Sequence, residues 1–221
     1  MHRILTAKLG VTMKLYDYHR APNPRRVRIF SAEKGIELEK VKIDLGSKQQ
    51  MEAEYRSLNS RLSIPALELD DGSILTESVA ICRYLEELQP EPALFGTGAF
   101  GKATVEMWHR RVELEGLTPI SEAVRNSVKF FAGRAMPGPL DFEQIPELAE
   151  RAKKRVSFFY GMLNDRLIDS PYIAGNDFSI ADITAFVGVD FAKVIKKRIG
   201  EDQTALQRWQ DEVSARPSAK A

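Results

Sequence analysis

Three features between Arg61 and Ser78 limit the fold of this chain more than any other part of the sequence. The first is Ile64-Pro65, directly before a strand-like run, where a cis peptide bond costs only about 0.5 to 1 kcal/mol. We expect this bond to be cis, which leaves the amide and carbonyl of Ile64 free. The second is Asp71-Gly72, which predicts a tight hairpin because both residues tolerate a positive φ.

The third feature is the pair Glu77-Ser78, which opens a helical pattern of apolar residues. The members of this pattern are Ile81, Tyr84, Leu85 and Leu88. Backbone amides at a helix N-terminus favour an anionic group. Together, the three features predict a site for a small, extended ligand that carries a carboxylate.

These residues resemble the glutathione site of the cytosolic-type glutathione transferases, and the similarity to the bacterial theta-like and nu-like classes extends from about Met13 onward. In that family a cis-proline loop pairs with the cysteinyl backbone of glutathione, and an acidic-serine pair binds its γ-glutamyl end. The resemblance implies that Ile64 and Pro65 make the first contact and that Glu77 and Ser78 make the second. It also implies glutathione as co-substrate, with no metal.

The resemblance places the group that stabilises the thiolate between the first strand and the first helix. Ala21 occupies the position where theta-like and nu-like enzymes carry serine or threonine, so the usual hydroxyl is absent. Asn23 matches an asparagine of nu-like enzymes, and its amide can donate to a thiolate. Tyr18 is a second candidate, near the tyrosine of other classes. Alternatively, Asn23 is a helix cap just before Pro24.

Two further positions are implied to hold the glycyl carboxylate of glutathione. Gln50 lies where theta-like enzymes use a polar or basic side chain, and Ser63 falls near their lysine position. Either residue can instead be an ordinary solvated loop residue.

The alternation of strand and helix patterns predicts two domains. Residues 13–94 show a β-α-β pattern followed by β-β-α, which suggests a small mixed sheet covered by helices, the α/β thioredoxin-like fold. The stretch Gln89–Gly101 is rich in proline and glycine and predicts a linker. Helical spacing recurs within residues 101–221, with a break at Gly133–Pro139, so we expect an all-helical (all-α) C-terminal domain. The resemblance implies that this domain holds a second-substrate pocket, completing a glutathione transferase fold.

Within these domains, strands are expected at Met13–Tyr18 and Glu39–Ile43 and a helix at Pro24–Lys34. A long helix from Ala103 to Phe131 is expected to kink at Thr118-Pro119.

A buried helix cap is expected further along the helical half. Ser179 is placed as the N-cap and Asp182 as the acid three residues later, with Phe178 and Ile183 as a hydrophobic staple. Loss of the Asp182 carboxylate is expected to cost about 0.5 to 2 kcal/mol of stability.

Charge and composition exclude several classes of function. The chain has 32 lysines and arginines against 31 aspartates and glutamates, so it has no global field that would attract nucleic acid or an anionic membrane. Arg25, Arg26 and Arg28 are too few for nucleic acid, and we expect them on a solvated helix face or at a dimer contact. The single cysteine, Cys82, excludes an intramolecular disulfide and suits a cytoplasmic protein. We expect it to be a buried structural thiol.

No apolar run approaches the roughly 20 residues of a membrane helix. Met1–Thr12 lacks the apolar centre of a secretory signal, and we expect it to be a leader or the product of a misplaced start.

The leading hypothesis is an enzyme that converts the thiol of glutathione to a thiolate for attack on an electrophilic small molecule held between the domains. A close alternative is glutathione-dependent disulfide reduction or peroxidase activity, favoured by an asparagine in place of a hydroxyl. A third is a noncatalytic binding module, supported by Ala21. The resemblance also implies a homodimer. One sequence does not identify the electrophile, so detoxification, catabolism and redox repair all stay open.

Overall fold

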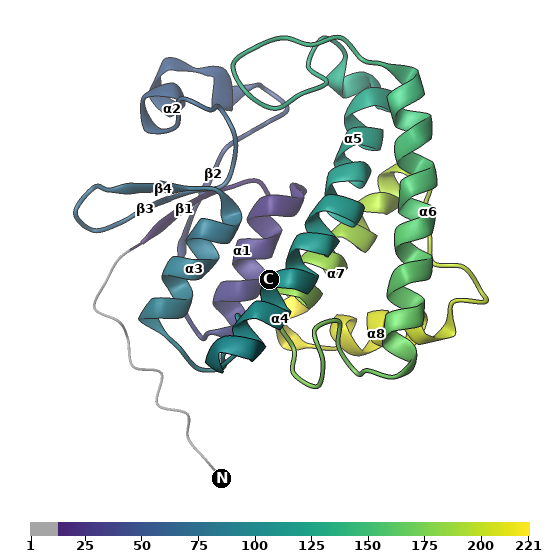
Figure 1. Ribbon diagram of the computed structural model, residues 1–221. Helices are drawn as coiled ribbons and strands as arrows, with labels where there is room; N and C mark the ends of the chain where they lie inside the picture. Colours follow the sequence, from purple (N-terminus) through teal and green to yellow (C-terminus); the bar gives the residue numbers. More distant parts are fainter. Residues whose placement is uncertain (1–12) are drawn as a thin grey trace. The chain divides into compact units, whose positions relative to one another are not determined.

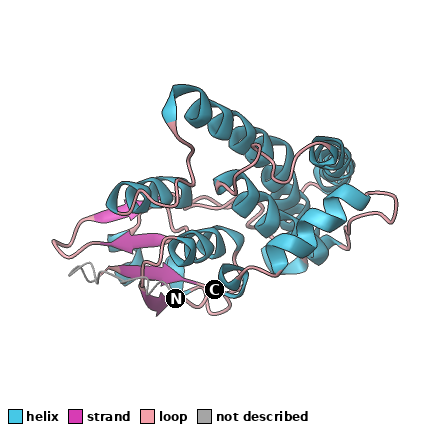
Figure 2. Ribbon diagram, turned by 90° about the horizontal axis from the view of Figure 1, so that it is seen from below, coloured by secondary structure: helices cyan, strands magenta, loops and turns pink. Residues whose placement is uncertain are grey.

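The computed structural model describes residues 13–221, which divide into two compact units, the first up to Pro92 and the second from Ala93 to Lys220. The expectation of a leader or misplaced start concerns Met1–Thr12, which lies outside the described residues. Figure 2 shows that the strands gather in one unit, whereas the other consists of helices and loops.

The first unit is built on a four-stranded mixed sheet. Its strand order is β2-β1-β3-β4, with β1 parallel to β2 and antiparallel to β3. In chain order, the elements are β1 (Lys14–Asp17), α1 (Pro22–Glu33), β2 (Glu39–Lys42), η1 (Gln49–Met51), α2 (Ala53–Leu58), β3 (Ala66–Glu68), β4 (Ile74–Thr76) and α3 (Ser78–Leu88). This order confirms the expected β-α-β and β-β-α pattern of a thioredoxin-like fold.

Helices α1 and α3 lie side by side on one face of the sheet, and α2 lies toward the other (Figure 1). Leu15 of β1 pairs with Leu67 of β3, and neither side chain is exposed to solvent. Phe30 of α1 and Ile81 of α3 are equally buried. The sheet and these two helices therefore share one apolar core, and burial of each large side chain contributes about 1.5 to 3 kcal/mol.

The second unit is all-helical, as expected. Its elements are α4 (Gly98–Arg111), η2 (Val112–Leu117), α5 (Thr118–Ser127), η3 (Lys129–Phe131), α6 (Pro146–Ile168), α7 (Ile180–Ala192), η4 (Lys193–Ile195), α8 (Thr204–Ser214) and η5 (Pro217–Lys220). Every residue from 180 to 189 is buried, so the start and middle of α7 are enclosed on all sides. A helix that is buried on all its faces belongs at the centre of its unit.

A π-helical turn, η2, joins α4 to α5 and ends directly before Thr118-Pro119, where the kink is expected. Gly116 lies in this turn against the ring of Phe159 on α6, so close that a Cβ atom at residue 116 would lie 2.4 Å from Phe159 Cζ. The π-helical turn thus places the backbone of Gly116 directly against the Phe159 ring. Because only glycine fits there, this packing explains the glycine in the middle of a long helical stretch.

The expected capping box at the start of α7 is confirmed. Ser179 caps the helix, and the Asp182 carboxylate accepts hydrogen bonds from the Ser179 amide and hydroxyl, both 3.0 Å. The same carboxylate also accepts from the amide of Ile173 and from Nε1 of Trp209, both at 2.9 Å. Asp182 therefore joins three segments of the unit, and its loss should cost more than an ordinary cap.

Some helix boundaries differ from those expected. Helix α1 begins at Pro22, two residues before Pro24, because both prolines fit the first turn of a helix. Helix α4 begins at Gly98, inside the expected linker, and α5 ends at Ser127 rather than at Phe131.

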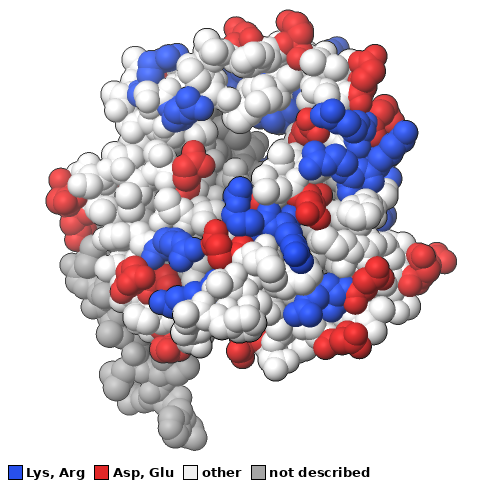
Figure 3. Space-filling view, viewed as in Figure 1, with Lys and Arg blue, Asp and Glu red and all other residues white. Residues whose placement is uncertain are grey.

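Acidic and basic side chains are interspersed over the face drawn in Figure 3, in keeping with the balanced overall charge. Among residues 13–221, no helix is both long enough and apolar enough to cross a bilayer.

Candidate functional site

The register of the sheet brings the predicted site segments to one edge. Tyr16 of β1 pairs with Ala66 of β3, and Ala66 in turn pairs with Thr76 of β4. The turn after β1, the proline before β3 and the helix start after β4 therefore all lie at the same end of the sheet. Since β2 runs parallel to β1, the segment that follows β2 and leads to Gln50 leaves from this end as well.

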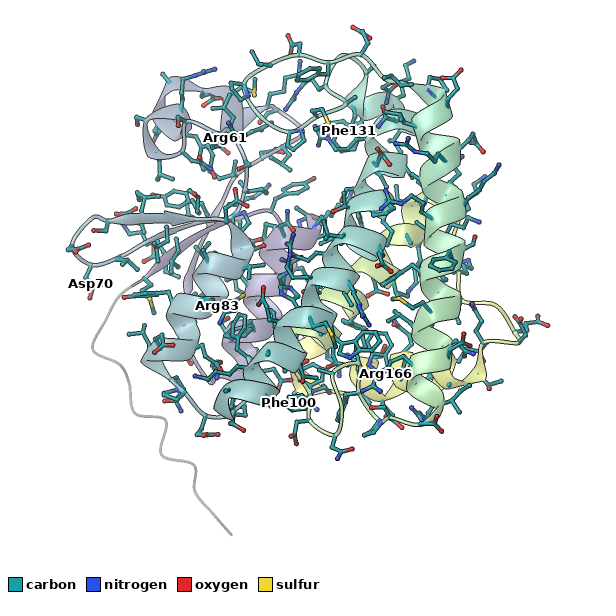
Figure 4. All side chains as sticks on the ribbon, in the orientation of Figure 1. Arg61, Asp70, Arg83, Phe100, Phe131 and Arg166 are labelled. Carbon is teal, nitrogen blue, oxygen red and sulfur yellow. The ribbon has the colours of Figure 1, made fainter. Side chains whose placement is uncertain are left out.

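The bond between Ile64 and Pro65 is cis, which confirms the first expectation. Pro65 is buried and leads directly into β3. The hairpin that follows turns at Gly72, which has φ +82°, and the Ser73 amide donates to Oδ1 of Asp71 at 2.8 Å. Figure 4 shows Asp70 at the tip of this hairpin. The hairpin thus returns the chain to the end of the sheet where Pro65 lies.

Helix α3 begins at Ser78, with Glu77 as its N-cap residue. Glu77 is exposed and adopts φ +66°, a conformation that is uncommon for residues other than glycine and typical of functional sites. Ser78 is buried, and its hydroxyl oxygen accepts a hydrogen bond from Nη1 of Arg26 at 3.3 Å. Because arginine only donates, the Ser78 hydroxyl keeps its own hydrogen for another acceptor. A carboxylate at this helix N-terminus would be such an acceptor.

The expectation that Arg26 and Arg28 lie on a solvated face is wrong. Arg26 is 1% exposed and Arg28 is 6% exposed. Arg28 forms a buried ion pair with Asp17, and its Nη2 donates to the His19 carbonyl at 3.1 Å. Arg26 contacts Ser78, and Arg28 contacts Asp17 and His19, so both arginines hold segments of the candidate site from the interior of the unit. The local sequence does not reveal this role.

The two candidate thiolate-stabilising residues both lie at this edge. Tyr18 lies in the turn after β1 and is half-buried, and its carbonyl accepts the Ala21 amide at 2.9 Å. Asn23 is exposed in the first turn of α1. Ala21, not Asn23, is the N-cap residue, and no side chain caps this helix. The capping interpretation of Asn23 is therefore wrong.

Gln50 and Ser63 have different environments. Gln50 is 4% exposed, and its Oε1 has no hydrogen-bond partner among the described residues. The interpretation of Gln50 as a solvated loop residue is therefore wrong, and it is buried with an unused polar atom. Ser63 is half-buried, and its carbonyl oxygen accepts two hydrogen bonds, from Tyr55 and Asn59.

The sequence analysis missed three residues that support this edge: Arg26 behind Ser78, and Tyr55 and Asn59 behind Ser63. The only sequence signal for Asn59 is its position a few residues before a proline loop, where asparagine side chains commonly bond to the backbone. No local signal marks Tyr55 or Arg26. Within the described range, no cluster of three or more histidine, cysteine or acidic residues is arranged to hold a metal ion.

Comparison with known proteins bears on the whole chain. Residues 15–93 match the model for the N-terminal domain of glutathione S-transferases, and residues 118–217 match the model for the C-terminal domain. Glutathione S-transferase 2 of Saccharomyces cerevisiae is 33% identical over 216 residues, covering 96% of this chain and 90% of the relative.

Solved structures agree with the sequence matches. The crystal structure of Gtt2 from Saccharomyces cerevisiae superposes with a TM-score of 0.86 at 32% identity and covers 94% of this chain and 98% of that one. A class Gtt2 glutathione S-transferase of Vibrio parahaemolyticus gives a TM-score of 0.80 at 35% identity, with 94% and 96% of the two chains covered.

Proposed function

The chain belongs to the glutathione S-transferase family, and from this premise we propose that it activates the thiol of glutathione as a thiolate for attack on an electrophilic small molecule. The observation that carries the proposal is the meeting, at one edge of the sheet, of the cis bond at Ile64-Pro65 and the helix start at Ser78. The first fits the backbone of an extended peptide, and the second fits a carboxylate.

Each predicted ligand contact has a proposed role. Ile64 and Pro65 pair with the cysteinyl backbone, Glu77 and Ser78 bind the γ-glutamyl end, and Gln50 holds the glycyl carboxylate. Gln50 can hold this carboxylate only through the N–H groups of its side-chain amide, because Oε1 accepts hydrogen bonds and does not donate them. The burial of Gln50 at this edge supports the role. Ser63 is the second candidate for the glycyl carboxylate and acts through its side-chain hydroxyl, because its carbonyl oxygen already accepts two hydrogen bonds.

The chemistry requires a group that favours the thiolate over the thiol. Each unit by which the pKa of the bound thiol falls needs about 1.4 kcal/mol of differential stabilisation. We propose that the side-chain amide of Asn23, together with the N-terminal amides of α1, supplies it, with Tyr18 as the second candidate. Exposure of Asn23 in the first helical turn supports this choice, because its amide is accessible to a ligand.

Calorimetric titration with glutathione, followed by the ultraviolet absorbance of the thiolate, tests the proposal. S-methylglutathione, which lacks the thiol, is the control for absorbance. We expect glutathione to bind with a thiol pKa below its value in water. Replacement of Asn23 by alanine should raise the pKa of the bound thiol by about one unit and slow turnover about tenfold, whereas Tyr18→Phe should leave both nearly unchanged.

A specific observation keeps the alternatives open. Ala21 provides no hydroxyl at the N-terminus of α1, which suits disulfide reduction, peroxidase activity or a noncatalytic binding module. Comparing the turnover of an aromatic halide with that of a small disulfide distinguishes the transferase activity from disulfide reduction. Binding of glutathione without a lowered thiol pKa would favour the noncatalytic module, and no binding would reject the site altogether.

We further propose that the helical unit supplies the second-substrate pocket, that the protein is a homodimer and that it is cytoplasmic, as its family resemblance implies. Size-exclusion chromatography with light scattering tests the dimer directly.

A further inference from the structure

Two buried side chains converge on a single backbone oxygen beside the cis bond. The Tyr55 hydroxyl donates to the carbonyl oxygen of Ser63 at 2.7 Å, and Nδ2 of Asn59 donates to the same oxygen at 2.7 Å. Tyr55 and Asn59 are each only 3% exposed. One carbonyl oxygen has two lone pairs, so these donors use its full capacity.

Both donors are themselves held in place. The backbone N–H of Asn59 donates to the Tyr55 carbonyl at 2.8 Å at the end of α2. The side-chain oxygen Oδ1 of Asn59 accepts a hydrogen bond from the backbone N–H of Arg61 at 3.0 Å. Leu62 is buried with φ +54°, and its amide donates to the Asn59 carbonyl at 2.9 Å. Figure 4 labels Arg61 on this turn, near α2. The turn is therefore held by hydrogen bonds of its own backbone and of the Asn59 side chain.

Peptide geometry converts this support into a direction for the next amide. Among the described residues, cis bonds occur only before Pro65 and Pro92, so the unit between Ser63 and Ile64 is trans. In a trans peptide the carbonyl and the N–H point in opposite directions. Because the Ser63 carbonyl faces two buried donors, the Ile64 N–H faces away from them.

The Ile64 amide is also available. None of the residues in the described range accepts a hydrogen bond from its N–H, and Ile64 is half-buried rather than enclosed. Backbone amides that are removed from water normally find a partner. A peptide carbonyl of a ligand laid along the segment before β3 would be that partner.

We infer that Tyr55 and Asn59 are positioning residues that aim the Ile64 N–H at a backbone carbonyl of the ligand. They make the site select an extended peptide over other anionic thiols, without touching the ligand. The inference rests on the proposed function, since glutathione is the peptide concerned. Burial raises the pKa of Tyr55 to about 12, so its hydroxyl stays a donor across the working pH range.

The experiment compares Tyr55→Phe, Asn59→Ala and the double variant with the wild type. Tyr160→Phe is the matched control, because Tyr160 is also buried but its hydroxyl has no hydrogen-bond partner in the described part of the chain. Glutathione affinity is measured by calorimetry, the steady-state constants are measured with an electrophile, and the Ile64 amide is followed by NMR.

We expect Tyr55→Phe to weaken glutathione binding about fivefold and the double variant to weaken it further, with KM raised and kcat at saturation unchanged. The NMR signal of the Ile64 amide should shift in Tyr55→Phe and in the double variant. Tyr160→Phe should change neither the affinity for glutathione nor the Ile64 signal. Variants that are less stable but bind glutathione as tightly as the wild type would overturn the inference. If Asn59→Ala does not fold, the affinity and the Ile64 signal of the conservative variant Tyr55→Phe decide whether the inference holds. Absence of binding by the wild type would instead reject the proposed function, and this inference with it.

Discussion

The guanidinium of Arg28 lies 2.5 Å from the carboxylate of Asp17, and both side chains are almost completely buried. This pair joins the end of β1 to the middle of α1. Since Arg28 also bonds the His19 carbonyl, it holds both ends of the turn that carries Tyr18. The first segment of the candidate site is therefore fixed from inside the unit.

Removal of one charge from this pair should be strongly destabilising. In Asp17→Asn, Arg28 loses its buried counter-charge, and we expect the free energy of unfolding to fall by about 3 kcal/mol. Urea denaturation measures the loss. Glu150→Gln is the control, because the exposed pair of Glu150 with Lys153 should contribute nothing measurable. Equal stabilities of the two variants would contradict the prediction.

The stability of the protein should depend on the protonation of Asp182. Burial raises the pKa of Asp182 to about 6 from an ordinary 3.8, although four hydrogen bonds to the carboxylate favour the ionised form. Between these values the folded state holds a proton that the unfolded state has released. The contribution of Asp182 to stability is therefore complete below about pH 4 and is lost as the pH rises to about 6, by about 3 kcal/mol.

The matched variant for this titration is Asp182→Asn, which keeps the shape but does not ionise. The difference in unfolding free energy between wild type and variant should fall with rising pH over this window, because all other groups titrate in both proteins. A difference that stays constant from pH 4 to pH 7 would show that the pKa of Asp182 is not raised.

Cys82 should be inert toward thiol reagents in the folded protein. Burial raises the pKa of its thiol to about 12, so the thiolate that reacts with such reagents is scarce at pH 8. Ellman's reagent should label it in denaturant but not in buffer. Rapid labelling of the native protein would mean that the interior between α1 and α3 opens readily.

Gly116 should not tolerate a side chain. In Gly116→Ala the new methyl group would overlap the Phe159 ring, and we expect a loss of about 1 to 3 kcal/mol. Gly161→Ala is the matched control within α6, where a Cβ atom would meet nothing within 4 Å. That variant should gain about 0.5 to 1 kcal/mol, because alanine favours the helix. Thermal unfolding of both variants is the measurement, and a stable Gly116→Ala would disprove the close packing.

Local signals account for what the sequence predicted well. A proline before a strand, the Asp71-Gly72 turn and the Ser179 cap each depend on a few neighbouring residues, so short patterns were sufficient. The burial of Arg28 was not predicted, because its partner Asp17 lies on another element and only the folded chain brings them together. Likewise, nothing local shows that Gly116 approaches Phe159.

The same limit applies to the candidate site. The edge of the sheet at which its residues gather follows from the strand order β2-β1-β3-β4, whereas the sequence patterns predicted only the order of the elements along the chain. The support behind it depends on distant pairs such as Arg26 with Ser78, which no short pattern contains.

The double hydrogen bond to the Ser63 carbonyl has a consequence for how this protein tolerates change. The inferred recognition uses the main-chain N–H of residue 64, so it does not depend on the chemistry of the side chain there. The vulnerable positions are the concealed ones at 55 and 59, which a mutational survey restricted to ligand neighbours would pass over.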